Sequence, residues 1–388
     1  MEQQLQAWLR ICSFFGIYVS ATKCTDNDNI RDVRGHTNSR AYWLQRGYNC
    51  LLFLIICIVF GCSVCWQTIP PGLELNWIAV TILFATRLIT NAFILMEAVW
   101  KQQQHEDFLK ALQAIEASMQ LRLKWRIDSA TLLWQIKRLL KYHLAFSVLG
   151  IVPFMVATWV IRDYSGYFWQ GLWYICSIRV RTLQLLVYLR ILRHYLRDFC
   201  LQLQQLVAYR RTPQHRLLDF DYGRLDTLHQ LLALKETYML LYETFELLKD
   251  FAGWSLFGIV ITSLLDLSSN FYWLLQSFDN FLGRRYYYLA DLWWFLPVAA
   301  LICELCYLCD NCRHLDGIVS LLLSQLIRLN SASARRQYQL VLQQFAMQLQ
   351  LQRIEITARA FFTLDFRFMM SFCAAMAMHL RKNNKSNI

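Results

Sequence analysis

The sequence predicts an all-α membrane protein with seven transmembrane helices, a cytoplasmic N-terminus and long helical extensions on the cytoplasmic side. Composition is the first observation behind this prediction: 56% of the 388 residues are hydrophobic and only 17% are charged, whereas soluble domains carry fewer apolar and more charged residues. The second is a series of nearly uncharged stretches, each about as long as the 20 residues that cross a bilayer. The third is the distribution of Lys and Arg between those stretches.

The first stretch lies within Gly47–Leu73, which contains no charged residue. The second is interrupted only by Arg87, and the fourth carries Arg179 and Arg181 in its second half. A seventh stretch, beginning near Phe361, is the weakest. The predicted spans are 48–66, 75–96, 142–161, one from about residue 164, 251–279, 286–309 and 361–380.

The basic residues predict the orientation of these spans. Of the 39 Lys and Arg residues, 29 lie in the N-terminal segment and the second, fourth and sixth connections, and 6 lie in the alternate segments. Cytoplasmic loops carry the excess of positive charge, so the N-terminus is expected inside. The resulting domains are an N-terminal segment 1–47, spans one to six over 48–309 with connections 97–141 and 190–250, anchor-type helices over 310–360, and a last, shortened helix over 361–388.

The cytoplasmic connections are expected to be helical because Gly and Pro are absent from most of their length. Apolar residues recur in them at spacings of three and four, which is typical of a buried helix face. The pattern alone does not decide whether these faces pack within one bundle or against another subunit. The three stripes are Phe108, Leu112, Ile115, Met119 and Leu123; Leu231, Leu234, Tyr238, Leu241, Phe245 and Leu248; and Met347, Leu351, Ile354, Ala358 and Phe361.

Ionisable residues within spans are candidate functional groups because burying a charge in the membrane is costly. Asp266, near the middle of span five, is the strongest candidate; Arg87, Arg179, Arg181, Asp291 and Glu304 either line a wet cavity, pair with one another or lie near span ends. Aromatic residues gather at the outer ends of the spans, where they form an interfacial belt or line a ligand pocket. The pocket candidates are Trp159, Tyr164, Trp169, Trp173, Asp266, Tyr272, Trp273, Trp293 and Trp294.

No cofactor, metal or catalytic site is expected. Cys303, Cys306, Cys309 and Cys312 resemble a metal-binding run, but a helix would spread them over about 13 Å along its axis. Packing or palmitoylation explains them better. The net charge of +12 is distributed as a topology signal, and no basic cluster with glycine and aromatics predicts a nucleic-acid partner.

Two segments resemble insect gustatory receptors, a family of seven-span chemosensory receptors and channels. The stretch Thr357-Ala-Arg-Ala-Phe-Phe-Thr-Leu-Asp-Phe-Arg-Phe-Met-Met-Ser-Phe-Cys-Ala-Ala resembles the C-terminal signature of that family. Arg10-Ile-Cys-Ser-Phe-Phe-Gly resembles its N-terminal segment. The seven-span plan with an inside N-terminus covers essentially the whole chain.

The resemblance implies a taste receptor in the plasma membrane of sensory neurons, acting as a ligand-gated cation channel of four subunits, as a homomer or with other gustatory receptors. A small tastant would bind among the outer halves of spans two to six, with membrane lipid around them. It also implies an anchor-to-pore junction at Phe362, Asp365 and Arg367, and a pore helix that starts at Phe368, Met369 and Ser371.

The sequence departs from the family pattern after this point. Met378 and His379 stand where the family has Thr-Tyr, and its Gln-Phe ending is absent. The uncharged stretch 368–380 makes about 20 Å of helix, short of the ~30 Å hydrocarbon core. A splice variant, a wrongly joined final exon or a decayed receptor would explain this ending. The alternative function is a membrane transporter that uses Asp266 and Arg87, although no internal repeat supports it.

Overall fold

A computed structural model of the protein describes residues 2–18, 34–66, 74–125, 127–161, 168–211, 228–278, 288–330, 336–358, 362–372 and 374. The structure is helical apart from two short strands, which confirms the predicted all-α class. Its elements are α1 (Glu2–Phe14), α2 (Arg34–Trp66), α3 (Glu74–Trp100), α4 (Gln102–Ala117), the π-helix η1 (Ser118–Arg122), α5 (Ser129–Ile161), α6 (Phe168–Arg211), α7 (Leu228–Phe278), α8 (Tyr288–Asn330), α9 (Arg336–Leu351), β1 (Thr357–Ala358) and β2 (Phe362–Thr363). Residues 366–372 form a further short helix.

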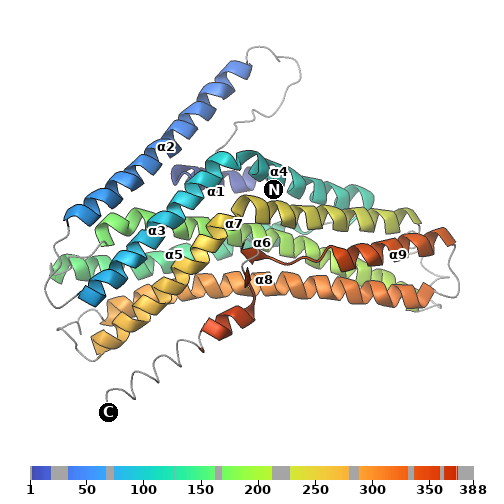
Figure 1. The fold of residues 1–388 in the computed structure, drawn as a ribbon. Helices are drawn as coiled ribbons and strands as arrows, with labels where there is room; N and C mark the ends of the chain where they lie inside the picture. The colour runs from blue at the N-terminus through green and yellow to red at the C-terminus, as the bar shows by residue number, and fades with distance from the viewer. Residues whose placement is uncertain are drawn as a thin grey trace.

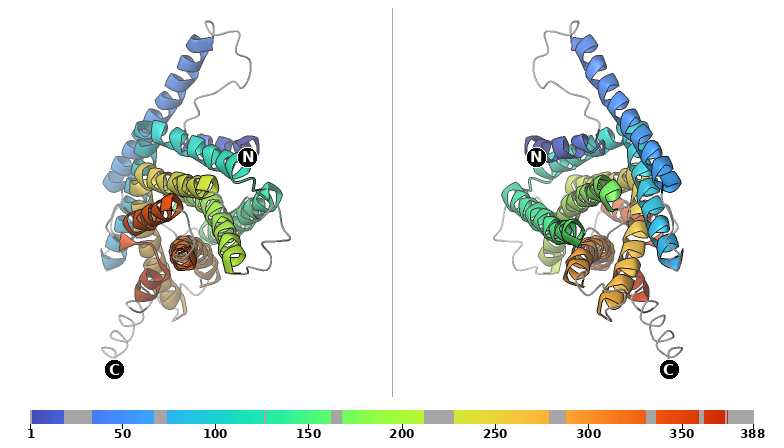
Figure 2. Two further views of the ribbon diagram at one scale, coloured as in Figure 1. Left: turned by 90° about the vertical axis from the view of Figure 1, so that its right-hand side faces the viewer. Right: turned by 90° about the vertical axis from the view of Figure 1, so that its left-hand side faces the viewer.

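Helices α6 and α8 run along the long axis of an elongated molecule, and α2, α3 and the C-terminal part of α7 lie obliquely to it (Figure 1). Helix α7 has 51 residues and is therefore about 75 Å long, more than twice the thickness of a hydrocarbon core. The views along that axis show α2 on the outside of the bundle (Figure 2). Helices α6, α7 and α8 consequently connect the two ends of the molecule.

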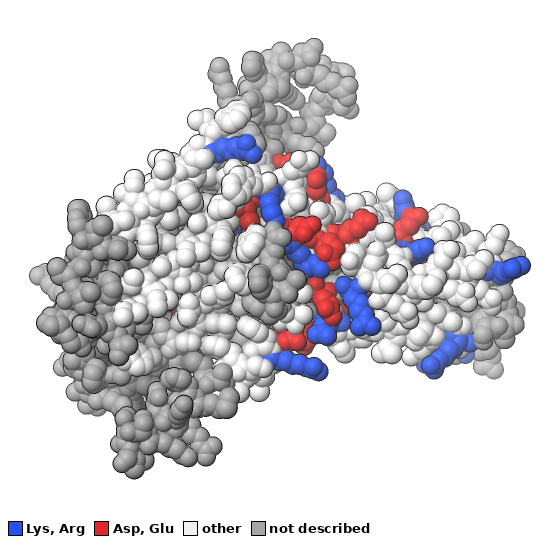
Figure 3. Space-filling view, in the orientation of Figure 1, with Lys and Arg blue, Asp and Glu red and all other residues white. Residues whose placement is uncertain are grey.

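Charged side chains divide the visible face into two parts. Lys, Arg, Asp and Glu gather over the middle and towards the end formed by α4, α9 and the C-terminal part of α8, while the described surface over α2 and α3 is largely free of them (Figure 3). We call these the charged half and the apolar half. The apolar half contains the exposed aliphatic residues of α2, among them Leu51, Leu54 and Ile58.

Within the described part of the chain, five helices are long and apolar enough to cross a membrane, over Trp43–Cys62, Val80–Trp100, Ser129–Val156, Leu228–Leu274 and Leu289–Leu329. Each overlaps a predicted span. The predicted fourth span falls in α6. This helix is not apolar enough to be counted with the five, because it carries Arg179 and Arg181. Every residue of α6 from Ser177 to Leu189 is buried, so protein rather than lipid surrounds this part of the helix. Residues 362–372 and 374 of the predicted seventh span are described, and its helix starts later than predicted, because Phe362–Thr363 form a strand and the helical residues begin at 366.

Two of the three predicted apolar stripes are confirmed as buried faces. All five residues from Phe108 to Leu123 and all six from Leu231 to Leu248 belong to the main core. The third stripe is wrong within α9, where Met347 is 57% and Leu351 85% exposed, whereas Ile354, beyond the end of that helix, is buried in the core. Phe361 lies outside the described residues. Helix α9 instead buries Tyr338, Leu342, Phe345 and Leu349, another face with the same three-and-four spacing, and Gln residues separate the two faces.

The predicted helical connection 97–141 is interrupted twice. Lys101 separates α3 from α4, and residues 123–128 separate η1 from α5. The second break follows a widened turn in which the Trp125 N–H donates to the Met119 carbonyl at 2.9 Å. Asp128 then caps α5, since its carboxylate accepts the Thr131 N–H at 3.1 Å. An Asp at the N-cap favours a helix start at that position, so the connection is divided here without Gly or Pro.

A candidate ligand site between four helices

The site begins with the close approach of α3 and α7. A Cβ on Gly258 would lie 2.9 Å from the Thr90 hydroxyl, so the missing side chain brings the two helices together. One turn away, the hydroxyls of Thr90 and Thr262 form a 2.7 Å hydrogen bond. This register places Arg87, one turn before Thr90, opposite Asp266, one turn after Thr262.

Arg87 and Asp266 form a buried ion pair, in which the Arg87 Nη2 group donates to an Asp266 carboxylate oxygen. Their side chains are only 10% and 12% exposed. Asn91, which follows Arg87 by one turn, donates to the Arg87 and Tyr174 carbonyls at 2.9 and 3.2 Å and links α3 to α6. The prediction that charges within spans pair with one another is confirmed for Asp266.

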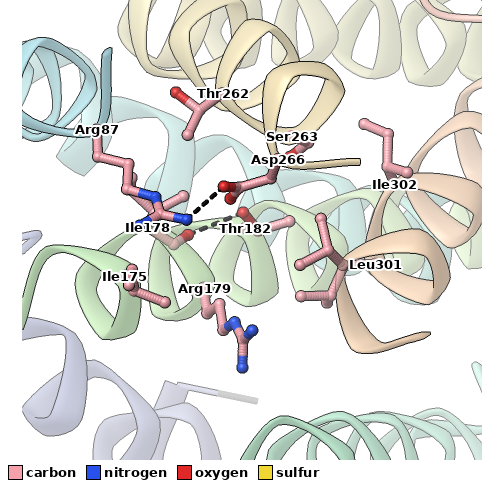
Figure 4. A pocket seen from close by; sticks show the side chains of 11 residues that line it. Arg87, Ile175, Ile178, Arg179, Thr182, Thr262, Ser263, Asp266, Leu301 and Ile302 are labelled. Carbon is pink, nitrogen blue, oxygen red and sulfur yellow. Dashed lines mark hydrogen bonds and ion pairs between the residues drawn. The ribbon is translucent and has the colours of Figure 1, made fainter. Parts of the chain in front are cut away.

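The pair borders a cavity of about 20 Å³, room for about one water molecule. Its walls come from α3, α6, α7 and α8 (Figure 4). Three hydroxyl groups contribute to them, from Thr182, Thr262 and Ser263. The other lining residues are Arg87, Ile175, Ile178, Arg179, Asp266, Val298, Leu301 and Ile302. The spacing of Ile175, Ile178, Arg179 and Thr182 is that of one helix face.

Arg179 lies in this cavity wall, and no carboxylate among the described residues forms an ion pair with it. Its Nη1 group donates to the Ser147 carbonyl of α5 at 3.1 Å, and its Cζ lies 5.0 Å from the centre of the Trp294 ring. Its Nη2 is buried and has no hydrogen-bond partner in the part of the chain that the structure describes. The Arg179 side chain points away from the Arg87–Asp266 pair (Figure 4). The Asp266 carboxylate therefore does not accept a hydrogen bond from the Arg179 Nη2 group.

Arg181, two residues further along α6, has a complete set of partners. It forms a 3.3 Å ion pair with Glu97, and the two side chains are only 3% and 4% exposed. Its Nε and Nη2 donate to the Ser255 hydroxyl at 3.1 and 3.0 Å, and its Nη1 donates to Gln184 at 2.6 Å. Glu97 also accepts the Trp254 backbone N–H at 2.7 Å. This second arginine therefore lies in a closed polar network.

His105 extends that network into the charged half. Its Nε2 lies 2.8 Å from the Tyr188 hydroxyl, and its ring stacks on Phe251 at 4.5 Å. Burial, with a contribution from the Arg181 charge, lowers the pKa of His105 to about 3. The imidazole is therefore neutral at ordinary pH.

Two of the predicted pocket residues reach this region. Asp266 lines the cavity, and Trp294 contacts Arg179 and the Phe154 ring, the latter at 5.1 Å. The Trp173 ring instead lies 4.8 Å from Phe15, beside the N-terminal segment. Trp159, Tyr272 and Trp293 are 71%, 43% and 39% exposed, and Trp273 contacts Tyr272. Trp169 lies in the first turn of α6, and Tyr164 falls outside the described residues.

The predicted junction lies where the strands meet the last short helix. Thr357 pairs with Thr363, and Ala358 pairs with Phe362. Asp365 is buried and accepts the Phe368 N–H at 2.8 Å, which caps the helix. Arg313 of α8 lies 3.6 Å from both Asp365 and Glu355. Met369 is buried, Phe368 packs on the core, and Arg367 and Ser371 are exposed.

Sequence reasoning missed Glu97 and Arg313. Glu97 falls at the start of a predicted connection. Lys101 follows it by one helical turn, and such a spacing of opposite charges is ordinary on an exposed helix, so nothing in the sequence indicated that Glu97 is buried. Arg313 lies in a region of mixed charges. The four cysteines of α8 are distributed along one helix, with Cys306, Cys309 and Cys312 buried and Cys303 exposed. Among the described residues, no three His, Cys, Asp or Glu side chains gather as a metal site would require.

Comparison with known proteins identifies the family. The profile of the 7tm chemosensory receptor family matches residues 5–380. The chain belongs to this chemosensory receptor family. This receptor is 25% identical over 343 residues to a Drosophila melanogaster protein assigned as gustatory receptor 39b, covering 88% of this chain and 91% of that protein. It is 28% identical over 152 residues to gustatory receptor 23a of the same species, covering 39% of this chain and 40% of that protein.

Solved structures give the same fold. The receptor superposes on the insect olfactory receptor OR5 from Machilis hrabei with a TM-score of 0.65 at 13% identity, covering 97% of each chain. The same olfactory receptor in complex with eugenol superposes with a TM-score of 0.61 at 13% identity, covering 96% of each chain. The suspected resemblance to insect gustatory receptors is thus confirmed, and the fold is that of an insect chemosensory membrane receptor.

Proposed function

We propose that this receptor is a subunit of a tastant-gated cation channel in the plasma membrane of sensory neurons, with a small tastant bound in the cavity between α3, α6, α7 and α8. The observation that supports this most directly is the cavity itself, where Arg87, Arg179 and Asp266 lie buried among four helices of the apolar half. Buried ionisable residues of this kind commonly mark ligand or ion sites in membrane proteins.

The small volume of the cavity places a condition on this proposal. About 20 Å³ accommodates one water-sized group and not a whole tastant. Binding must therefore separate the helices, and a ligand that favours the wider arrangement shifts the population towards it. Helices α6, α7 and α8 extend from the cavity into the charged half, so they can carry such a movement to the junction at Asp365.

The proposed topology has seven spans, a cytoplasmic N-terminus and an extracellular end of the last helix. The alternation of basic residues along the sequence supports it. An epitope tag before residue 2 should be stained by antibody only after the plasma membrane is permeabilised. A tag in the predicted external connection near residue 164 should be stained without permeabilisation, and the reverse pattern would reject this orientation.

The proposed channel assembles as a homotetramer or with other gustatory receptors. Whole-cell recording tests it in cells that express the chain alone and with a co-expressed gustatory receptor. A tastant panel should evoke an inward current that disappears when extracellular Na⁺ is replaced by N-methyl-D-glucamine. A matched chain that ends before residue 361, and therefore lacks the predicted pore helix, should reach the surface without producing current.

The same recording distinguishes a channel from the alternative function, a membrane transporter. A channel current continues when the tastant is present at equal concentration on both sides of the membrane, whereas coupled uptake needs the tastant gradient. Current that requires this gradient, or current that persists in the chain ending before residue 361, would contradict the channel proposal.

A further inference from the structure

The charges around the cavity do not balance. Two arginines and one carboxylate line it, which leaves one positive charge. Asp266 is held by Arg87, while Arg179 has a backbone carbonyl and an aromatic ring as partners. An arginine side chain stays protonated in proteins, so this charge is permanent.

Burial makes that imbalance costly. Arg179 is only 6% exposed, and moving an ion out of water has an effective cost of several kcal/mol unless a partner compensates for it. Arg181 shows the compensation that the same helix provides elsewhere, with an ion pair and three further hydrogen bonds. No carboxylate among the described residues forms a direct ion pair with Arg179, and one of its N–H groups is left buried without a hydrogen-bond partner there.

From this arrangement we propose that Arg179 makes the cavity an anion site that takes the carboxylate group of a ligand. The inference rests on the proposed receptor function and adds the chemical class of its ligand. A planar carboxylate matches the guanidinium fork, and Ser263 of α7 adds a hydroxyl to the cavity lining. Ile175, Ile178, Val298, Leu301 and Ile302 supply apolar contacts for the chain that carries the carboxylate.

The ligand carboxylate reaches Arg179 without competing with the Asp266 carboxylate for Arg87, because the Arg179 side chain points away from the Arg87–Asp266 ion pair (Figure 4). A bound carboxylate would draw the guanidinium from the Ser147 carbonyl and the Trp294 ring. Those two contacts connect α6 to α5 and α8, so carboxylate binding and the separation of the helices are the same event.

Thermal unfolding of the purified full-length receptor in phosphatidylcholine nanodiscs tests the inference without any recording of current. Butyrate, 1-butanol and butylamine share a chain length and differ in the terminal group. A ligand that binds only the folded state raises Tm with concentration. Butyrate should raise Tm, and the alcohol and the amine should have no effect at the same concentrations.

Two further arms identify the source of the carboxylate. Oleate added to the nanodiscs tests a fatty acid that enters from the bilayer, and butyrate tests an acid that enters from water. The larger shift identifies the source. A chloride titration is run in parallel, and a rise in Tm with chloride equal to the rise with butyrate would reject a carboxylate site in favour of a halide site.

Substitutions connect the shift to Arg179. Arg179→Gln should abolish the butyrate shift, and Arg179→Lys, which keeps a cation, should retain part of it. Arg122→Gln removes an exposed arginine of the charged half, 53% exposed and paired with Glu236, and should retain the full shift. No shift with any carboxylate, or an equal shift in Arg179→Gln, overturns the inference. A shift without any tastant-evoked current would keep the inference and reject the proposed channel.

Discussion

Arg179 and Arg181 lie on one helix, two residues apart, in opposite situations. Two residues correspond to about 200° around a helix, so Arg179 faces α5 and α8 while Arg181 faces α3 and α7. Arg181 contacts Glu97, Ser255 and Gln184. Arg179 contacts the Ser147 carbonyl and the Trp294 ring, and its Nη2 has no hydrogen-bond partner among the described residues.

The difference separates a structural charge from one available to a ligand. Removing one partner of a buried, fully hydrogen-bonded ion pair has a large cost, because the other charge is left buried without compensation. A buried charge without an anion already carries its desolvation cost, so its removal from the empty receptor should cost little. The substitutions below test this contrast, beginning with the largest expected effect.

Breaking the Arg181–Glu97 pair should have the largest effect on stability. Glu97→Gln leaves Arg181 buried without its carboxylate partner, and Arg181→Met leaves Glu97 buried without its arginine partner. Each should lower the free energy of unfolding by about 3–5 kcal/mol and reduce the fraction of receptor at the cell surface. Unfolding in nanodiscs and surface labelling measure the two effects.

The matched control is an exposed pair. Asp107 and Lys110 are 43% and 57% exposed and 2.8 Å apart, so Asp107→Asn should change stability far less than Glu97→Gln does, because exposed ion pairs contribute little. If Glu97→Gln were as mild as Asp107→Asn, the Arg181 network would not be a structural element.

The Arg87–Asp266 pair should show an intermediate effect that depends on both partners. Asp266→Asn and Arg87→Gln should each destabilise the receptor, and the double variant should be less damaged than the sum of the two. The expected coupling is about 0.5–3 kcal/mol, the range for residues in contact. Additive effects would show that the two side chains do not interact in the folded receptor.

These two pairs also show how far the sequence predicts the site. Asp266 and the three arginines are recognisable because a charge within an apolar stretch is unusual. Their pairing cannot be recognised in the sequence, because it depends on the register of α3 against α7. The close approach of Gly258 and Thr90 sets this register. Glu97 was missed because it lies at the end of an apolar stretch, where a charge is ordinary.

The fold was more predictable than the site. Period and composition predicted the helical extensions, since the buried stripes of α4 and α7 follow the spacing of apolar residues. The same rule selected the wrong face of α9, where two apolar faces compete and only tertiary contacts decide. Most of the aromatic candidates lie outside the cavity for a related reason: an interfacial belt and a pocket have the same composition.

A pH titration examines the surroundings of Arg181. The folded-state pKa of His105 is lowered to about 3 from 6.5, first by burial and then by the Arg181 charge. Below pH 6.5 the unfolded chain binds a proton that the folded receptor does not. Stability should therefore fall as pH falls between about 6.5 and 3, by about 1.4 kcal/mol per pH unit from this group.

Unfolding of His105→Gln in nanodiscs at pH 7.5 and 5.5 measures that contribution. The variant should lose about 1.4 kcal/mol less than the unaltered receptor between these two values, since the first pH unit lies above the unfolded-state pKa. Equal losses would mean that His105 is accessible to protons in the folded receptor.

The smallest effect is expected at Arg179 in the absence of ligand. Arg179→Gln removes a hydrogen bond to the Ser147 carbonyl and the contact with Trp294, but it also removes an unbalanced buried charge, and these changes oppose each other. The free energy of unfolding should change by less than about 1 kcal/mol, against about 3–5 kcal/mol for Arg181→Met two residues away. Unfolding of both variants in the same nanodiscs, without carboxylate, gives the comparison. A loss at Arg179→Gln as large as that at Arg181→Met would make both arginines structural, and Arg179 would then owe its burial to α5 and α8 rather than to a ligand.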